Sequence, residues 1–551
     1  MTPLRLNVVR FLALLLLVWS SGAHAGPKKL PPQPIDPKTA TDHDGQPIPE
    51  PDFREKSLYG HQLREAIVEP LSQSFDVPDR ILHLLGKGPR HEAVNVNAYD
   101  EVANSTWFTN RNHFRAMAPD SVRLGSARAE VIPTPPFTIK SRKQGGVNPG
   151  FTIKDKNGKR WVVKLDRPGY PQLGSGADVV VDRLFWAAGY NVSHDVACTF
   201  GRDELVIDDE LKQGKDKAPP FGEADLDSLL LRGDRGADGR YSGQASLYLE
   251  GKPVGPIDMR LRRPDDPNDR FRHRNRRELR GLYVLCSWVG SWDTKDHQSL
   301  DTFIESVDSL GFVRHHLLDF GASIGAAAEG PRPPERGYEY TIDGKWMAFR
   351  LLTLGFVSEP WRRIPREVPI PSLGNFESQV WQPNQFKSLQ PHGAFHEMTA
   401  GDAYWGAKLV ASFSDAQIAA AIDAVGYEDP RVKPAMLQLL KERRDKIMRY
   451  WFAKVVPLDF FEVKSGQLRF RDLAVDRGIA SPRAYSIHVE GPGIAQEHLS
   501  ASETALDLAQ LGPRATRAEL EFEIEGLNAK SVIVNLHREG NAWTIERIRH
   551  G

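Results

Sequence analysis

Two acidic residues, Asp293 and Asp319, stand in patterns that favour phosphoryl transfer. Asp293 opens an acidic loop in which Lys295 follows two places later and Gln298 three places after that. Asp319 follows an apolar run and begins the tripeptide Asp-Phe-Gly. Phosphoryl transfer needs a group that orients the nucleophile, a cation on the phosphoryl oxygens and ligands for a metal. We therefore expect Asp293 and Lys295 to be catalytic, and Asp319 with Gln298 to hold Mg²⁺ or Mn²⁺.

A lysine on a predicted strand is the candidate for binding the phosphates of ATP. Alternating segments at 151–155 and 160–165 flank Asn157-Gly158, the strongest short signal for a hairpin. A two-residue turn there would place four side chains on one face, namely Phe151, Ile153, Val162 and Lys164. An ammonium group on an apolar face needs an anionic partner unless it reaches solvent. We therefore expect Lys164 to bind the nucleotide.

Residues on either side of this hairpin would complete a phosphate site. A helix is expected over residues 176–188, ended by Gly189, with Asp178 and Asp182 four places apart on one face. One of these carboxylates would orient Lys164. Glycines precede the first strand, where backbone amides can approach phosphate oxygens, namely Gly145, Gly146 and Gly150.

The remaining chain alternates between helical and strand patterns. Helices are expected at 276–289, 400–410, 415–425 and 432–452, with Ser414 and Gln417 forming a capping box. Strands are expected at 195–200, 204–207, 312–318, 519–525, 531–536 and 542–548. The stretch 95–111 is a polar and aromatic loop, in which Trp107 and Arg111 either cover a neighbouring domain or bind a ligand.

At these residues the chain resembles the protein-kinase-like superfamily, and more closely its atypical exported branches, such as spore-coat and Golgi secretory-pathway kinases. It also resembles uncharacterised exported bacterial proteins with a D-x-K-x-x-N-S-L-D segment followed by H-Y-L-I-D-F-G. The matching segments here are residues 293–301 and 315–321, and the resemblance covers residues 145–325 well. It implies an α+β, two-lobed protein-kinase-like fold with ATP in the cleft.

Composition and local patterns, together with the resemblance, divide the chain into parts. The expected parts are a signal peptide (1–25), a Pro-rich disordered tether (26–55), an N-terminal cap (56–135), a kinase-like N-lobe (136–207), a polar insertion (208–275), a helical C-lobe (276–456) and a small C-terminal antiparallel β extension (457–551).

Three departures from the family pattern leave a second reading open. The usual helix glutamate is an aspartate, Gln298 stands where a metal-binding asparagine is expected, and the glycine loop is irregular. A pseudokinase, or an envelope scaffold that holds a partner without turnover, is therefore an alternative. A third class is a metal-dependent hydrolase built from His297, His315 and His316, although adjacent strand residues point to opposite faces.

Composition and the N-terminus point to an exported protein. The chain has 551 residues and a formal net charge of zero, so it lacks the excess of positive charge that is typical of nucleic-acid-binding proteins. Arg5 and Arg10 precede an apolar run at 11–19 and the small-residue segment Ala-His-Ala, the pattern of a secretory signal. No transmembrane segment is expected after its removal, so we expect a periplasmic or extracellular protein. Whether Cys198 and Cys286 pair stays open.

Overall fold

The computed structural model describes residues 42–55, 92–143, 147–214, 219–365 and 367–551. The predicted signal peptide, the first part of the tether, residues 56–91 of the expected N-terminal cap, and Gly145 and Gly146 lie outside the described residues. Within them the chain is mixed α+β, as the sequence predicts.

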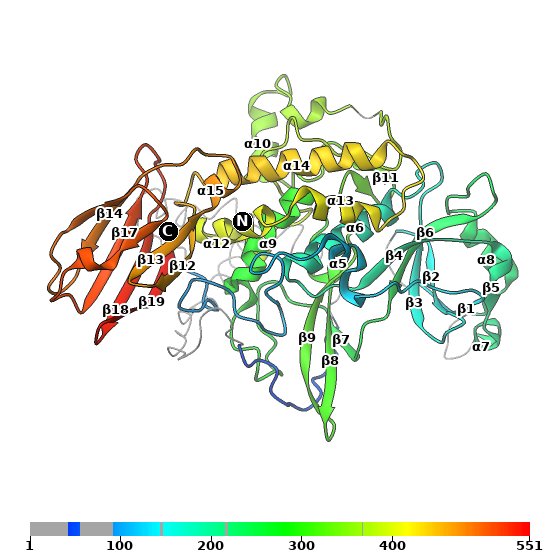
Figure 1. Ribbon diagram of the computed structural model, residues 1–551. Helices are drawn as coiled ribbons and strands as arrows, with labels where there is room; N and C mark the ends of the chain where they lie inside the picture. Colours follow the sequence, from blue (N-terminus) through cyan, green and yellow to red (C-terminus); the bar gives the residue numbers. More distant parts are fainter. Residues whose placement is uncertain (1–41, 56–91, 144–146, 215–218, 366) are drawn as a thin grey trace, which may run out of the picture. The chain divides into compact units, whose positions relative to one another are not determined.

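A six-stranded sheet has the order β4-β6-β3-β2-β1-β5 (Figure 1). Lys164 lies on its strand β3. Neighbouring strands are antiparallel except β1 and β5, which are parallel. Three helices lie between strands of this sheet in the sequence: α6 (Gly174–Ala188), α7 (Asp209–Gln213) and α8 (Glu223–Leu230). Its strands are β1 (Phe137–Arg142), β2 (Gly150–Lys154), β3 (Arg160–Leu165), β4 (His194–Phe200), β5 (Leu205–Ile207) and β6 (Tyr241–Leu247). The expected polar insertion thus supplies β6, which pairs with both β3 and β4 in the middle of the sheet.

The hairpin between β2 and β3 forms, but its predicted register is wrong by one residue. Asp155 N donates to Lys159 O at 2.9 Å, so the turn contains three residues rather than two. The Asp155 carboxylate sets this geometry because its Oδ1 accepts from the amides of Asn157 and Lys159, both at 2.9 Å. Lys164 consequently pairs with Gly150, and Phe151 pairs with Val163. Lys164 therefore lies on the face opposite Phe151 and Ile153, not beside them.

The helical part of the chain is built around α9 (Arg277–Val289), which is buried along its whole length. The indole of Trp288 on α9 donates to Leu440 O on α14 at 2.9 Å. The Ser414 and Gln417 capping box at the start of α13 is confirmed. The other helices are α5 (Pro119–Leu124), α10 (Gly344–Leu352), α11 (Gly393–His396), α12 (Ala400–Ala411), α13 (Asp415–Asp423) and α14 (Val432–Trp451).

A second sheet leads into the Asp-Phe-Gly turn. Its order is β7-β8-β9, with the strands β7 (Lys252–Gly255), β8 (Ser299–Val307) and β9 (Leu310–Leu317). A short ladder of β10 (Ala326–Ala327) with β11 (Gly330–Pro331) follows the turn. Residues 42–55, expected within the disordered tether, run beside this sheet: Ile48 pairs with Gly311 and is buried with Val254, Phe303 and Val313. The end of the expected tether is therefore packed onto the fold.

The expected C-terminal antiparallel extension is present (Figure 1). It has its own core, which includes Phe461, Leu520 and Val534. It contains two sheets, β12-β13-β16 and β15-β14-β17-β18-β19. The elements are β12 (Leu458–Lys464), β13 (Gln467–Asp472), α15 (Leu473–Asp476), β14 (Tyr485–Glu490), β15 (His498–Ala501), β16 (Ala505–Asp507), β17 (Arg517–Glu523), β18 (Val532–Glu539) and β19 (Ala542–His550).

Two remaining features concern export and redox state. Among the described helices, none combines the length and apolar character needed to cross a bilayer. Cys198 and Cys286 are both free thiols, and burial raises the pKa of each to about 12. Both cysteines are therefore unreactive packing residues at neutral pH.

Buried neutral histidines predict that the fold weakens in mild acid. Burial, with the charge of Arg260, lowers the pKa of His392 to about 3. As the pH falls below about 6.5, this histidine binds a proton in the unfolded chain but stays neutral in the folded chain. Its contribution to the unfolding free energy is therefore present above that pH and is lost as the pH falls. For this one side chain the loss between pH 6.5 and 5 is about 2 kcal/mol.

Urea unfolding at several pH values measures this effect. The variant His392→Asn should reduce the drop in unfolding free energy over that interval by the same amount. His273 does not add to this loss between pH 6.5 and 5, because the pKa of its ring, which is buried beside Asp269, is raised. Its contribution is complete below pH 6.5 and is lost only at higher pH. Equal pH slopes in the wild type and His392→Asn would contradict the assignment.

Candidate active site

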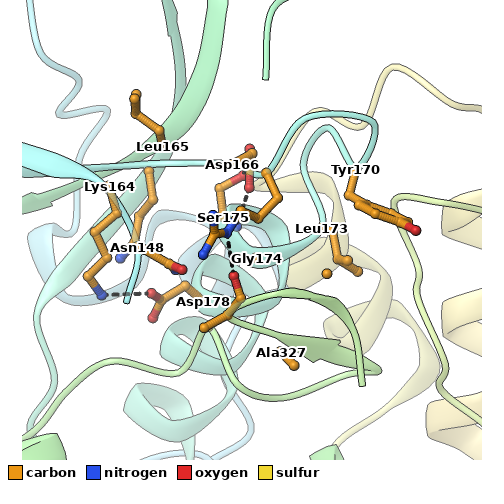
Figure 2. Close-up of a pocket in the computed structure, with 15 residues that line it drawn as sticks. Asn148, Lys164, Leu165, Asp166, Tyr170, Leu173, Gly174, Ser175, Asp178 and Ala327 are labelled. Carbon is orange, nitrogen blue, oxygen red and sulfur yellow. Dashed lines mark hydrogen bonds and ion pairs between the residues drawn. The ribbon is translucent and has the colours of Figure 1, made fainter. Parts of the chain in front are cut away.

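Lys164 joins three elements that are remote in the chain. Its Nζ lies 3.3 Å from Oδ2 of Asp178 on α6 and 2.8 Å from Oδ1 of Asp319 in the turn after β9. Figure 2 shows the first of these pairs, with the lysine reaching from β3 toward the helix. The lysine side chain is only 12% exposed. Burial opposes its protonation, but the charges of Asp178 and Asp319 outweigh burial and raise the pKa of Lys164.

Asp178 is fixed on both sides of its carboxylate. Its Oδ2 pairs with Lys164, and its Oδ1 accepts from the amide of Phe320 at 2.7 Å. The short arm of the aspartate therefore reaches the lysine and also holds the Asp-Phe-Gly turn. Asp166, at the end of β3, sets the start of α6 by accepting from Ser175 N at 3.0 Å. This contact ties the helix carrying Asp178 to the strand carrying Lys164.

Asp182, the other predicted helix acid, does not join this group. Its side chain pairs with the neighbouring Arg183, whose guanidinium also donates to Arg123 O and Asp195 O. Burial raises the pKa of Asp182 well above its usual value. Of the two candidates, only Asp178 contacts Lys164.

The acidic loop lies directly beside the Asp-Phe-Gly turn. Lys295 Nζ is 2.7 Å from Asp293 Oδ1, and Gln298 Nε2 donates to Asp293 Oδ2 at 3.2 Å. The loop is held in place because Leu318 N donates to Gln298 O at 2.9 Å. Burial and the nearby charge of Asp319 raise the pKa of Asp293.

Asp319 has an uncommon backbone geometry for a residue other than glycine. Its φ is +59°, in the left-handed region, which aspartate tolerates better than most residues. The next residue, Phe320, is buried and packs edge-on against Phe185 of α6 with ring centroids 5.1 Å apart. Burial would raise the pKa of Asp319, but the positive charges of Lys164, Lys143 and Lys295 lower it. The carboxylate is therefore ionised and sits among cations.

The donor set fits a hard divalent metal. Gln298 Oε1 is buried and has no hydrogen-bond partner among the described residues, so a carbonyl oxygen is left available beside Asp293. Mg²⁺ is commonly held by one or two carboxylates together with substrate phosphates, and Asp319 with Gln298 supplies such oxygens. No group of three or more His, Cys, Asp and Glu side chains in the described chain is arranged to hold a metal by itself.

The pocket at Lys164 has polar groups for a phosphate ligand but little open space. Its lining includes Lys164, Asn148, Gln244 and Gly174 (Figure 2). Asn148 Oδ1 is buried without a hydrogen-bond partner among the described residues. The cavity measures about 20 Å³, enough for a water molecule. A nucleotide would therefore need its walls to separate.

Two further predictions concern glycine and histidine. A Cβ at Gly150 would lie 2.2 Å from Val163 O, so the close approach of β2 to β3 already requires glycine there. His315 pairs with Asp301 at 2.7 Å and stacks on Trp107, whereas His316 contacts Thr302 at 3.1 Å. The two adjacent histidines thus bind separate partners.

One member of the site was missed by sequence reasoning. Asp195, on β4, is fully buried, and neither of its carboxylate oxygens has a hydrogen-bond partner within the described residues. Its charge acts on both Lys164 and Asp178. In the sequence, Asp195 is one position of a buried strand beside Val196, and no local pattern marks it as a site residue. It comes near Lys164 because β4 pairs with β6.

Comparisons with known proteins place a kinase among the similar structures. No family model matches the chain, and no curated protein matches it. The crystal structure of the Golgi casein kinase is similar with 14% identity and a TM-score of 0.27, covering 77% of this chain and 96% of that one. The same kinase with Mn/ADP bound gives 13% identity and a TM-score of 0.27, covering 76% and 95%. At these scores the likeness is too weak to carry a functional argument, so we take the function from the site itself.

Proposed function

We propose that this chain is an exported, two-lobed kinase-like phosphotransferase that uses ATP and Mg²⁺ or Mn²⁺ to modify a hydroxyl group on an acceptor. The observation that supports this best is the bridge from Lys164 to both Asp178 and Asp319. A lysine held by a helix acid, next to an Asp-Phe-Gly turn, is the arrangement that positions phosphates in protein kinases.

The residues around the bridge have distinct roles in this proposal. Lys164 binds phosphate oxygens, and Asp178 keeps its ammonium group in place. Asp319 and Gln298 would hold the metal, which would supply positive charge to neutralise the transferred phosphoryl group. Asp293 accepts the proton of the acceptor hydroxyl, and its raised pKa suits a group that must take up a proton. Lys295 stabilises negative charge beside it.

A pseudokinase is the second candidate, and two observations favour it. The cavity is narrow, at about 20 Å³. Asp319 is also engaged by Lys164 at 2.8 Å, so metal binding must compete with an ion pair. A protein of this kind would hold a partner, or a nucleotide, without turnover.

Thermal unfolding with ATP and MgCl₂ tests whether the site binds nucleotide. We expect the melting temperature of the wild type to rise, since a ligand at 100 times its Kd stabilises by about 2.7 kcal/mol. Asp319→Asn keeps the left-handed backbone but removes the metal-binding charge, and it should abolish the rise that depends on the metal.

Asp308→Asn is the matched control, because Asp308 is exposed and also has a positive φ, +49°. It should respond to the ligands as the wild type does. A wild type that shows no shift with either metal, or an Asp319→Asn variant that shows the full shift, would contradict the proposal.

A further inference from the structure

A second cavity, with polar and basic walls, lies apart from the pocket of Figure 2. It measures about 490 Å³, which is within the range of small-ligand sites. Its walls come from residues 104–111 and 126–128, the C-terminal end of α6 and the strand β9. No described residue lines both cavities.

Arginines from three separate segments reach this cavity: Arg111, Arg128 and Arg314. Arg111 is held at the end of α6, since its Nη1 donates to Trp186 O at 2.7 Å and to Tyr190 O at 3.1 Å. Neither Arg111 nor Arg128 forms an ion pair with a carboxylate in the part of the chain that the structure describes. Their positive charges are thus left without an acidic partner there.

The acids nearby do not cancel this charge. Arg314 pairs with Glu250 at 3.1 Å, but the glutamate side chain is 73% exposed, and such a pair is weak. Asp44 also lines the cavity and keeps its negative charge, while its carboxylate accepts from the amide of Thr106 at 3.0 Å and from its hydroxyl at 2.7 Å. Three arginines against this one carboxylate leave the lining with a net positive charge. Burial, and to a smaller extent the charge of Arg128, lower the pKa of Arg111 to about 10.

A buried histidine also lines this cavity. His316 is 5% exposed, and its Nε2 lies 3.1 Å from the hydroxyl of Thr302. Its Nδ1 is buried and has no hydrogen-bond partner among the described residues. Buried polar atoms usually have a partner, so this one indicates a missing ligand or water.

The backbone also presents Arg128 to the cavity in an uncommon way. Its φ is +56°, and its amide donates to Gly125 O at 3.1 Å, which ends a short 3₁₀ turn. A bulky residue in the left-handed region costs conformational free energy, and such residues cluster at ligand sites.

We propose that this cavity is a binding site for a phosphate- or sulfate-bearing ligand. Guanidinium groups match the geometry of such oxyanions, because their N–H groups form paired hydrogen bonds. Arg111, Arg128 and Arg314 supply the charge, and His316 lines the same cavity. The site does not depend on the phosphotransferase activity proposed above.

Melting curves of the mature chain, without nucleotide or divalent metal, test this site with inorganic phosphate and sulfate as the probes. Ionic strength is held constant with chloride, so that general screening does not change. We expect a saturable rise in melting temperature as the anion concentration increases. A rise with both anions supports the site, and a rise with phosphate alone identifies a phosphoryl group as the ligand. Arg128→Gln and Arg314→Gln should each weaken the apparent affinity at least tenfold.

Two controls locate the binding. Arg517→Gln changes an exposed arginine on β17 and should bind as tightly as the wild type. Lys164→Met should also keep the affinity, because its pocket is separate. The proposal is overturned if chloride stabilises as well as phosphate, if both cavity variants bind as the wild type does, or if Lys164→Met removes the effect.

Discussion

Asp293→Asn should lower the rate of phosphotransfer by about 10² to 10⁴-fold, the usual contribution of a positioned general base. Asparagine keeps the shape of the side chain, and its oxygen can still accept from Lys295 or Gln298. It cannot take up the proton of the acceptor hydroxyl. Lys164, Asp178 and Asp319 are untouched by this change, so the melting shift with ATP and MgCl₂ should persist.

This pair of readouts separates an enzyme from a pseudokinase. Phosphate release and autophosphorylation report turnover, whereas the melting shift reports binding. If the wild type shows the shift without turnover, the pseudokinase reading holds. If Asp293→Asn turns over as fast as the wild type, Asp293 is not the base. Asp308→Asn serves again as the control for a generic loss of one carboxylate.

Lys164 and Asp319 are 155 residues apart in the sequence, yet their side chains are 2.8 Å apart. Each of the two residues ends or follows a strongly patterned element, so the sequence could point to both of them. How those elements are arranged was an implication of the resemblance. The roles assigned to these residues stay predictions until the variants are measured.

The wrong register predicted for the hairpin between β2 and β3 shows that local patterns can predict a turn without giving its length. The Asn157-Gly158 signal is correct about the existence of the turn. Its length was decided by a side chain outside the dipeptide, the carboxylate of Asp155, which accepts two backbone hydrogen bonds. One extra residue in the turn moves Lys164 to the other face of the sheet. There Lys164 pairs with Gly150 on β2 and with Gln244 on β6.

Non-local pairing accounts for the other omissions. β6 lies in a charged, glycine-rich stretch, and it is a strand because β3 and β4 supply its partners on both sides. Asp195 belongs to the site for the same reason. Ile48, in a Pro-rich segment, is ordered by a backbone pair with Gly311 that no local pattern encodes.

The largest stability effect is expected from Lys408→Met, in a buried charge network at the start of the C-terminal extension. Lys408, on α12, is 4% exposed and pairs with Glu101 and, at 2.9 Å, with Asp459 of β12. Burial opposes its protonation, but the charges of Asp459 and Glu101 prevail and raise its pKa. Removing the ammonium takes the cation from the buried Glu101 and, among the described residues, leaves Asp459 with only His550, at 4.0 Å. Breaking a buried pair in this way typically costs about 3–5 kcal/mol.

Urea unfolding at pH 7 measures this loss, and a compensating change tests its cause. In Lys408→Met combined with Glu101→Gln and Asp459→Asn, the uncompensated charges are gone, so most of the lost free energy should return. Lys433→Met is the control, since Lys433 forms an exposed pair with Asp423 on the surface of α14. Its unfolding midpoint should stay near that of the wild type. If the triple variant is no more stable than Lys408→Met, the loss comes from packing of the lysine stem rather than from charge, because the methionine side chain is common to both.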